Sequence, residues 1–255
     1  MSSTPFSRRS FLAMSAVLPW AFRSAAAARS IPVGLELYSV RQALKQDPEG
    51  TVRAVAKMGY RAVEFYAPYF EWTDAQAKQM RKVLDQLGVR CYSTHNDADY
   101  FSPNNINRAR DLNLILGSEF VVSGLETGYH NHQAEFTGAV GQRPIDLLAK
   151  STKPSVMLQL DVGTCLEAGS DPVAWIRANP GRIRSIHCKD WSPDAGKGYK
   201  VLFGEGAADW KGIFQAAENG GGLEYYLIEQ EGSQFPEMET ASKCFEAFRA
   251  AHRER

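Results

Sequence analysis

The chain has 255 residues, of which 44% are hydrophobic and 23% are charged, a composition typical of globular proteins. Its 29 basic and 29 acidic residues cancel to a formal net charge of zero, and no basic stripe runs along the sequence. A nucleic-acid partner is therefore not expected, because affinity for a phosphate backbone comes from clustered Lys and Arg. The length favours one domain of the β/α-barrel type, which commonly needs roughly 250 residues, over two small domains.

The first 28 residues have the layout of a bacterial signal peptide. Arg8 and Arg9 precede an apolar stretch at 11–22, and small residues follow up to Ala28. The paired arginines followed by Phe-Leu resemble the twin-arginine signal. We therefore expect a twin-arginine signal peptide at 1–28, export by the Tat machinery to the periplasm, and a barrel domain at 29–255. The apolar stretch is too short for a stable membrane anchor. The alternative to a signal peptide is a disordered basic arm.

From residue 31 onward, short apolar runs alternate with amphipathic stretches, which indicates βα units and a parallel sheet. Strands are predicted at 33–40, 62–66, 89–94, 120–123, 127–132, 155–161, 183–189 and 225–229. Helices are predicted at 48–58, 73–87, 105–116, 144–150, 172–178, 210–219 and 237–252. Thr73 suits a helix N-cap, and Gly88 suits a helix C-terminus. Eight strands with a helix after nearly every one predict an α/β fold, a (β/α)8 TIM-type barrel.

One junction departs from the barrel pattern. Only residues 124–126 separate the fourth and fifth predicted strands. Parallel neighbours need a crossover of about a dozen residues, and extended chain covers at most about 3.5 Å per residue. The barrel is therefore expected to lack the helix between strands 4 and 5. One long strand, a hairpin and a distorted barrel are each compatible with this segment.

Four cysteines are scattered along the chain without a close pair: Cys91, Cys165, Cys188 and Cys244. Three of them lie in or beside apolar strand-like runs, where Cys behaves as a small buried hydrophobe. Free thiols are therefore expected, and a disulfide formed in an oxidising periplasm is the alternative.

In a barrel of this type the active site forms where the strands end. Four predicted strands end in, or next to, an imidazole or a carboxylate: His130, Asp161, His187 and Glu229. Taken singly, a residue of this kind is commonly a core residue whose polar atoms are hydrogen-bonded within the protein. On that reading Asp161 would cap a turn, and His187 would hydrogen-bond to the backbone. Their joint occurrence at strand ends favours ligands of a divalent metal, which would be Mn²⁺, Mg²⁺, Co²⁺ or Zn²⁺.

Polar and aromatic residues elsewhere are candidates for a substrate pocket. Glu36, Glu64 and His95 fall on early strands and are expected to line it. An aromatic group after the first two strands forms a wall for a sugar face or packs the loops; its members are Tyr38, Tyr66, Tyr69, Phe70 and Trp72. The predicted substrate-binding residues are Tyr38, Glu64, His95, His132 and Trp191.

An ordered set of motifs makes the prediction more specific. The motifs lie at 34–41, 128–132 with 135–136, 160–162, 171–173, 180–182, 187–190, 204–206 and 228–230. Together they resemble the sugar phosphate isomerase/epimerase family, which has the xylose isomerase-like TIM barrel and includes inosose dehydratases and ketose epimerases. The resemblance extends over residues 31–250.

The resemblance also implies roles for individual residues. Asp161, His187 and Glu229 take metal positions, and His130 takes the fourth. Lys189 and Glu135 line the substrate site. Relatives carry a full helical segment between strands 4 and 5, which this chain lacks.

The family chemistry implies a metal-dependent isomerase, epimerase or dehydratase that acts on a sugar or keto-sugar through an enediolate. Glu229 or Glu135 would be the catalytic base, and Lys189 would donate to oxygen. The substrate is expected to lack phosphate, because no Gly-rich or Arg-clustered cradle is present.

Two alternatives stay open: a metal-dependent hydrolase or lyase of an exported keto-glycoside, and a non-catalytic sugar-binding protein with a degenerate barrel. An endonuclease of the abasic-site type is disfavoured, because it would need more His and acidic ligands and a basic groove. A homo-oligomer is compatible with the sequence.

Overall fold

The structure is a computed structural model that describes residues 31–117 and 127–253. The signal peptide predicted at 1–28 and the strand predicted at 120–123 lie outside these residues and stay predictions. So does the short junction at 124–126. From Ile31 onward the chain forms one compact unit. Within the described ranges, none of the helices is both long and apolar enough to span a membrane.

The described residues form a curled sheet of seven strands in the order β3-β2-β1-β7-β6-β5-β4. All six neighbouring pairs are parallel. The strands are β1 (Val33–Glu36), β2 (Ala62–Phe65), β3 (Arg90–Thr94), β4 (Gly128–His130), β5 (Met157–Asp161), β6 (Ser185–Cys188) and β7 (Tyr225–Ile228). Parallel strands point the same way, so their carboxyl ends meet at one edge of the sheet.

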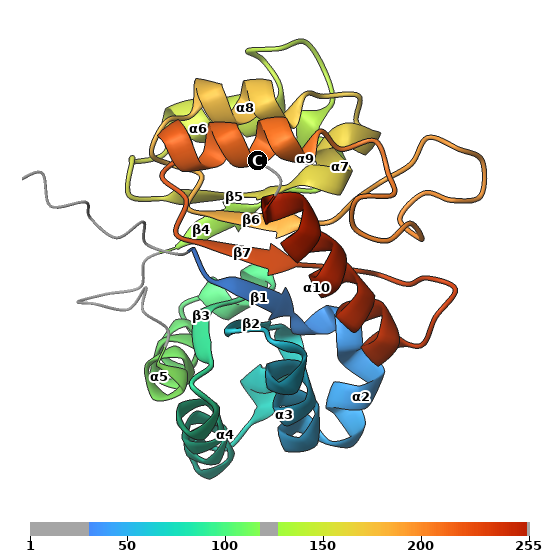
Figure 1. Cartoon of the computed structure of the whole chain (residues 1–255). Helices are drawn as coiled ribbons and strands as arrows, with labels where there is room; N and C mark the ends of the chain where they lie inside the picture. Colours follow the sequence, from blue (N-terminus) through green and yellow to red (C-terminus); the bar gives the residue numbers. More distant parts are fainter. Residues whose placement is uncertain (1–30, 118–126, 254–255) are drawn as a thin grey trace, which may run out of the picture. The chain divides into compact units, whose positions relative to one another are not determined.

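Helices alternate with these strands along the chain and lie outside the sheet, with α3 to α5 beside β1 to β3 and α6 to α9 beside β4 to β7 (Figure 1). They are α2 (Arg41–Gln46), α3 (Pro48–Met58), α4 (Asp74–Leu87), α5 (Ile106–Leu116), α6 (Pro144–Ser151), α7 (Val162–Glu167), α8 (Pro172–Ala178), α9 (Trp210–Ala216) and α10 (Glu237–Arg253). Short turns of helix complete the elements: η1 (Leu37–Val40), η2 (Ala67–Glu71), η3 (Ala98–Phe101), η4 (Gln133–Phe136) and η5 (Ala217–Gly221).

The first predicted strand is too long. Residues 33–40 were expected to be extended, but β1 ends at Glu36 and the chain turns into η1. The Glu36 carboxylate causes the turn by accepting the Tyr38 backbone N–H at 2.8 Å. The cap positions of α4 are confirmed: the Thr73 hydroxyl accepts the N–H of the third helical residue, and Gly88 ends the helix in the left-handed region at φ 62°.

The two faces of the sheet differ because successive strand residues point to opposite sides. On β2, Val63 and Phe65 belong to the main hydrophobic core, whereas Glu64 lies between them. On β6, Ile186 and Cys188 are core residues on either side of His187. The polar residues Glu64 and His187 therefore face the inner side of the curl, where a small second cluster of Tyr225 and Leu227 also lies, while the helices cover the main hydrophobic core. All four cysteines are buried free thiols, as expected.

Candidate metal centre

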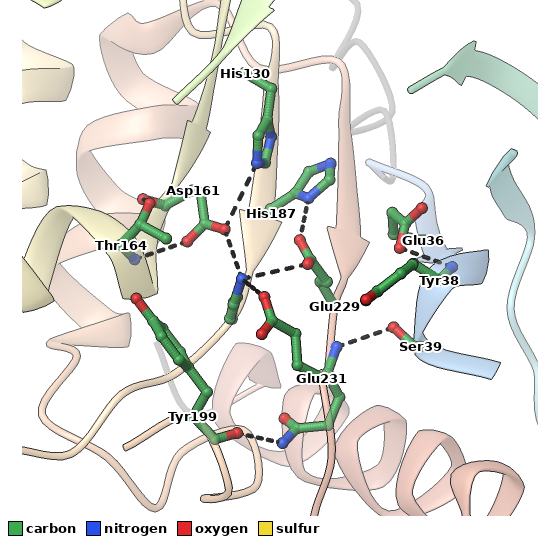
Figure 2. A network of polar contacts seen from close by, with 12 residues as sticks. Glu36, Tyr38, Ser39, His130, Asp161, Thr164, His187, Tyr199, Glu229 and Glu231 are labelled. Atoms are coloured by element: carbon green, nitrogen blue, oxygen red, sulfur yellow. Dashed lines mark hydrogen bonds and ion pairs between the residues drawn. The ribbon is translucent and has the colours of Figure 1, made fainter. Parts of the chain in front are cut away.

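The four residues predicted as metal ligands come together at the carboxyl edge of the sheet. Asp161 ends β5, His187 lies on β6, Glu229 follows β7, and His130 ends β4. Each offers one ligand atom, and these atoms all lie within 4.8 Å of one another. Figure 2 shows the four side chains pointing toward a common region. The ligand role itself stays a prediction, but the required convergence is present.

His187 is fully buried between two carboxylates. Its Nδ1 lies 2.6 Å from Glu229 Oε2, and its Nε2 lies 2.9 Å from Glu64 Oε1. Burial disfavours the imidazolium, but the two carboxylates outweigh burial and raise the pKa of His187 well above its ordinary value. The two carboxylates therefore favour the doubly protonated ring when no metal is bound.

Lys189 supplies a second buried cation to the same site. Its Nζ lies 3.3 Å from Asp161 Oδ2, 3.3 Å from Glu229 Oε1, and within bonding distance of Glu231. Burial alone would lower the pKa of Lys189, but the three carboxylates raise it. Burial would raise the pKa of Glu229, but Lys189 and His187 outweigh burial and hold this pKa well below its ordinary value. Glu229 is therefore ionised.

His130 is the neutral member of the set. Its Nε2 lies 3.7 Å from Asp161 Oδ2, and its Nδ1 lies 3.1 Å from Gln159 Oε1. Burial, reinforced by the positive His187 and by His95, lowers the pKa of His130 well below its ordinary value. A neutral imidazole is the form that binds a metal.

Asp161 caps a helix with one carboxylate oxygen and faces two other candidate site residues with the other. Its Oδ1 accepts the Thr164 backbone N–H at 2.9 Å and so caps α7, while Oδ2 faces Lys189 and His130. Burial raises the pKa of Asp161, and Lys189 opposes that rise. Both hypotheses for this residue, a turn cap and a site carboxylate, are thus compatible with its geometry.

The donor set fits a divalent transition metal. Two imidazoles and two carboxylates provide the mixed N and O ligands that such ions prefer. Ligands on opposite sides of one ion with bonds of about 2.2 Å are at most about 4.4 Å apart. A set already within 4.8 Å needs only small adjustments, chiefly the opening of the contact between His187 and Glu229.

The histidines predicted for the substrate pocket lie beside this centre. The His95 ring centroid is 4.7 Å from that of His130, and the His132 centroid is 5.3 Å from it. Four of the five histidines of the chain are therefore gathered here. Tyr38 is 39% exposed, and its ring packs edge-on against Tyr66.

The remaining predicted residues have local contacts. Glu135 accepts the Tyr129 hydroxyl at 2.9 Å and the His132 backbone N–H at 2.8 Å. Trp191 is half-buried and donates its backbone N–H to Asp190. Of the predicted aromatic wall, Tyr69 is buried and hydrogen-bonded to Asn96 at 2.5 Å, so it packs the interior.

Glu36 carries an unusual carboxyl group. It is buried, and its Oε1 has no hydrogen-bond partner among the residues that the structure describes. Burial, followed by the charges of Glu229 and Glu64, raises the pKa of Glu36 well above its ordinary value. Burial and these neighbours therefore favour the protonated form of this carboxyl group.

Sequence reasoning missed several residues of the site. Gln159 lies two positions before Asp161 and bonds to His130; Ser185 lies two positions before His187 and bonds to Gln159. Alternation along a strand could have found both, because residues two apart share a face. Glu231 lies beyond β7, so no strand pattern points to it.

Asp190 anchors the long loop that follows β6. Its buried carboxylate accepts the backbone N–H groups of Trp191, Gly204, Gly206 and Ala208 and the indole N–H of Trp210, at 2.9–3.3 Å. A Cβ at position 206 would stand 2.1 Å from Asp190 Oδ1, so glycine is required there. One carboxylate thus ties both ends of the loop 191–209 together.

Replacing Asp190 with Ala should destabilise the protein by at least about 3 kcal/mol, because several buried donors lose their acceptor. Urea unfolding followed by circular dichroism measures this change. Asp194→Asn is a matched control in the same loop, since its side chain is 61% exposed, and it should leave the unfolding midpoint unchanged. Equal midpoints for Asp190→Ala and wild type would contradict the anchoring role.

Comparisons with known proteins bear on the whole fold. No protein-family model matches the chain. It is 26% identical over 132 residues to an inosose dehydratase of Geobacillus thermodenitrificans, covering 46% of this chain and 44% of the relative. It is 28% identical over 139 residues to an inosose dehydratase of Clostridium tetani, covering 48% of this chain and 46% of the relative. The chain thus matches less than half the length of each curated relative.

Solved structures match over a larger part. A sugar phosphate isomerase/epimerase from Parabacteroides distasonis superposes with a TM-score of 0.69 at 24% identity, covering 91% of this chain and 98% of the other. A D-psicose 3-epimerase studied with D-fructose superposes with a TM-score of 0.62 at 12% identity, covering 87% of this chain and 99% of the other. The probable 3-DHS dehydratase of Bacillus anthracis superposes with a TM-score of 0.64 at 12% identity, covering 86% of this chain and 99% of the other. The chain has the TIM-type fold of these proteins. The predicted fold class is confirmed.

Proposed function

We propose that the protein is a divalent-metal-dependent isomerase, epimerase or dehydratase of a sugar or keto-sugar. The observation that carries the proposal is the convergence of His130, Asp161, His187 and Glu229 within 4.8 Å at the carboxyl edge of the sheet. Sequence similarity to inosose dehydratases and structural similarity to ketose epimerases support the same class of chemistry.

The reaction would begin with removal of the proton next to a carbonyl, which yields an enediolate. A divalent ion held by the four ligands supplies a Lewis acid that polarises substrate oxygens. Glu229 is the favoured base, because its ionised carboxylate lies inside the centre. Glu135 is the second candidate, and the cationic Lys189 would donate a hydrogen bond to a substrate oxygen.

The fate of the enediolate defines the product. Reprotonation on the opposite face gives an epimer, reprotonation at the neighbouring carbon gives an isomer, and loss of a β-hydroxyl gives a dehydrated product. The proposal includes twin-arginine export, which rests on residues 1–28 alone, and hence an unphosphorylated substrate in the periplasm.

Deuterium exchange tests the proposal. The protein loaded with Mn²⁺ is incubated in deuterated water with D-fructose, D-psicose and inosose, and the sugars are followed by NMR and mass spectrometry. We expect deuterium next to the carbonyl of at least one sugar, or loss of water from it. Asp161→Ala and chelator-treated protein should give neither.

Other outcomes would favour the alternatives. Binding of a sugar without label or mass loss would indicate a non-catalytic sugar-binding protein. Cleavage of a keto-glycoside without label in the recovered sugar would indicate a hydrolase. Either result contradicts the proposed chemistry.

A further inference from the structure

Glu64 lies behind the candidate metal ligands and has no free oxygen. It is only 1% exposed. Its Oε1 lies 2.9 Å from His187 Nε2, and its Oε2 accepts the Ser93 hydroxyl and the Gln159 amide N–H, the latter at 3.1 Å. Both oxygens are thus used inside the protein, on the side of His187 opposite Glu229.

The position of Glu64 determines which nitrogen of His187 can bind a metal. An imidazole that ligates through one nitrogen keeps its proton on the other. His187 Nδ1 faces Glu229, another candidate ligand, at 2.6 Å, whereas Nε2 faces the Glu64 carboxylate. A carboxylate only accepts, so it retains the proton on Nε2 and leaves Nδ1 for the ion.

The same logic extends to His130 through Gln159. Because Glu64 only accepts, the NH₂ group of Gln159 must face it, and the Gln159 carbonyl oxygen then faces His130 Nδ1 at 3.1 Å. That oxygen also only accepts, so His130 carries its proton on Nδ1. Its Nε2 is then free and lies on the side of Asp161, 3.7 Å from Oδ2.

We infer that Glu64 is a positioning residue for the metal centre. It acts directly on His187 and through Gln159 on His130, and it fixes both rings in the tautomers that present Nδ1 of His187 and Nε2 of His130 to the ion. The role differs from the substrate contact expected from its strand position. The inference rests on the proposed metal site and adds to it the residues that orient its imidazoles.

Three variants separate the contacts in this network. Glu64→Leu removes the acceptor for His187 and for Gln159. Glu64→Gln keeps an acceptor oxygen opposite His187 Nε2, but its NH₂ group then faces the NH₂ group of Gln159, so the link to His130 is lost. Gln159→Leu leaves the contact between Glu64 and His187 and removes the partner of His130 Nδ1, together with the amide donor to Glu64 Oε2 and Ser185.

Calorimetry measures Zn²⁺ affinity, and NMR of the Zn²⁺-loaded, ¹⁵N-histidine-labelled protein reports the tautomer of each ring. We expect Glu64→Leu to bind Zn²⁺ about 10- to 100-fold more weakly and to lose the exchange-protected Nε2 proton of His187. Glu64→Gln should keep that proton and bind Zn²⁺ more tightly than Glu64→Leu. Gln159→Leu should change the His130 signals and leave those of His187.

The outcomes distinguish this inference from the proposed function. Wild-type Zn²⁺ affinity and an unchanged His187 tautomer in Glu64→Leu would overturn the positioning role and leave the metal site standing. A wild-type protein that binds no divalent ion would overturn both. If Glu64→Leu does not fold, an unchanged His130 tautomer in Gln159→Leu overturns the network on its own.

Discussion

Asp161→Asn should bind Mn²⁺ more than about 100-fold more weakly than the wild-type protein. Partners that only orient a ligand commonly contribute 10- to 100-fold to metal affinity, so a lost carboxylate ligand should cost more. The asparagine keeps an oxygen that can cap α7, where Asp161 Oδ1 accepts the Thr164 N–H. The variant therefore isolates the loss of charge from the loss of the helix cap. Calorimetry with Mn²⁺ and elemental analysis of the purified protein measure the effect.

Asp171→Asn is the matched control. Asp171 caps α8 from an exposed position by accepting the Val173 N–H at 2.8 Å, and the candidate metal centre does not include it. Its replacement should leave Mn²⁺ affinity unchanged. Full metal content in both Asp161→Ala and His187→Ala would show that the metal centre has been placed at the wrong residues.

Lys189→Met should destabilise the metal-free protein by about 3–5 kcal/mol, the usual cost of removing one partner from a buried ion pair. The substitution leaves Asp161 and Glu229 buried without the cation that lies 3.3 Å from each. A divalent ion restores positive charge at this place. The unfolding midpoint of Lys189→Met should therefore rise more on addition of Mn²⁺ than that of the wild type.

Urea unfolding in chelator and in excess Mn²⁺ tests this prediction. Lys197→Met provides the control, because Lys197 pairs with Asp194 on the surface with 59% of its side chain exposed. It should match the wild type in both conditions. A Lys189→Met protein that is as stable in chelator as the wild type would mean that Lys189 does not compensate the buried carboxylates.

The candidate metal ligands could be predicted from sequence because each stands at the end of an apolar strand. That pattern is local, and parallel strands convert it into proximity at one edge of the sheet. His187 and Asp161 could therefore be predicted as site residues without knowledge of tertiary contacts. The residues that orient these side chains could not be predicted without tertiary contacts. Glu64 and Gln159 are 95 positions apart in the sequence and meet only because the sheet curls.

Element boundaries were harder to predict than element types. The apolar run at 33–40 has strand-like composition throughout, but the strand ends at Glu36, whose carboxylate accepts the Tyr38 backbone N–H at the start of η1. Helices α2 and α7 were not predicted, since six residues are too few to show a helical period. The other described strands are shorter than predicted by one to three residues.

The pairing of Lys189 and His187 with the buried carboxylates would affect how the protein acquires the proposed ion. Lys189 and His187 already place positive charge beside these carboxylates, so folding would not depend on the proposed ion. Loading with the proposed ion would then be an exchange of cations, in which the ion would take the place of the Nδ1 proton of His187 and would weaken the contacts of Asp161 and Glu229 with Lys189. Metal uptake would release protons into the solvent and would leave the lysine ammonium free to turn toward a sugar.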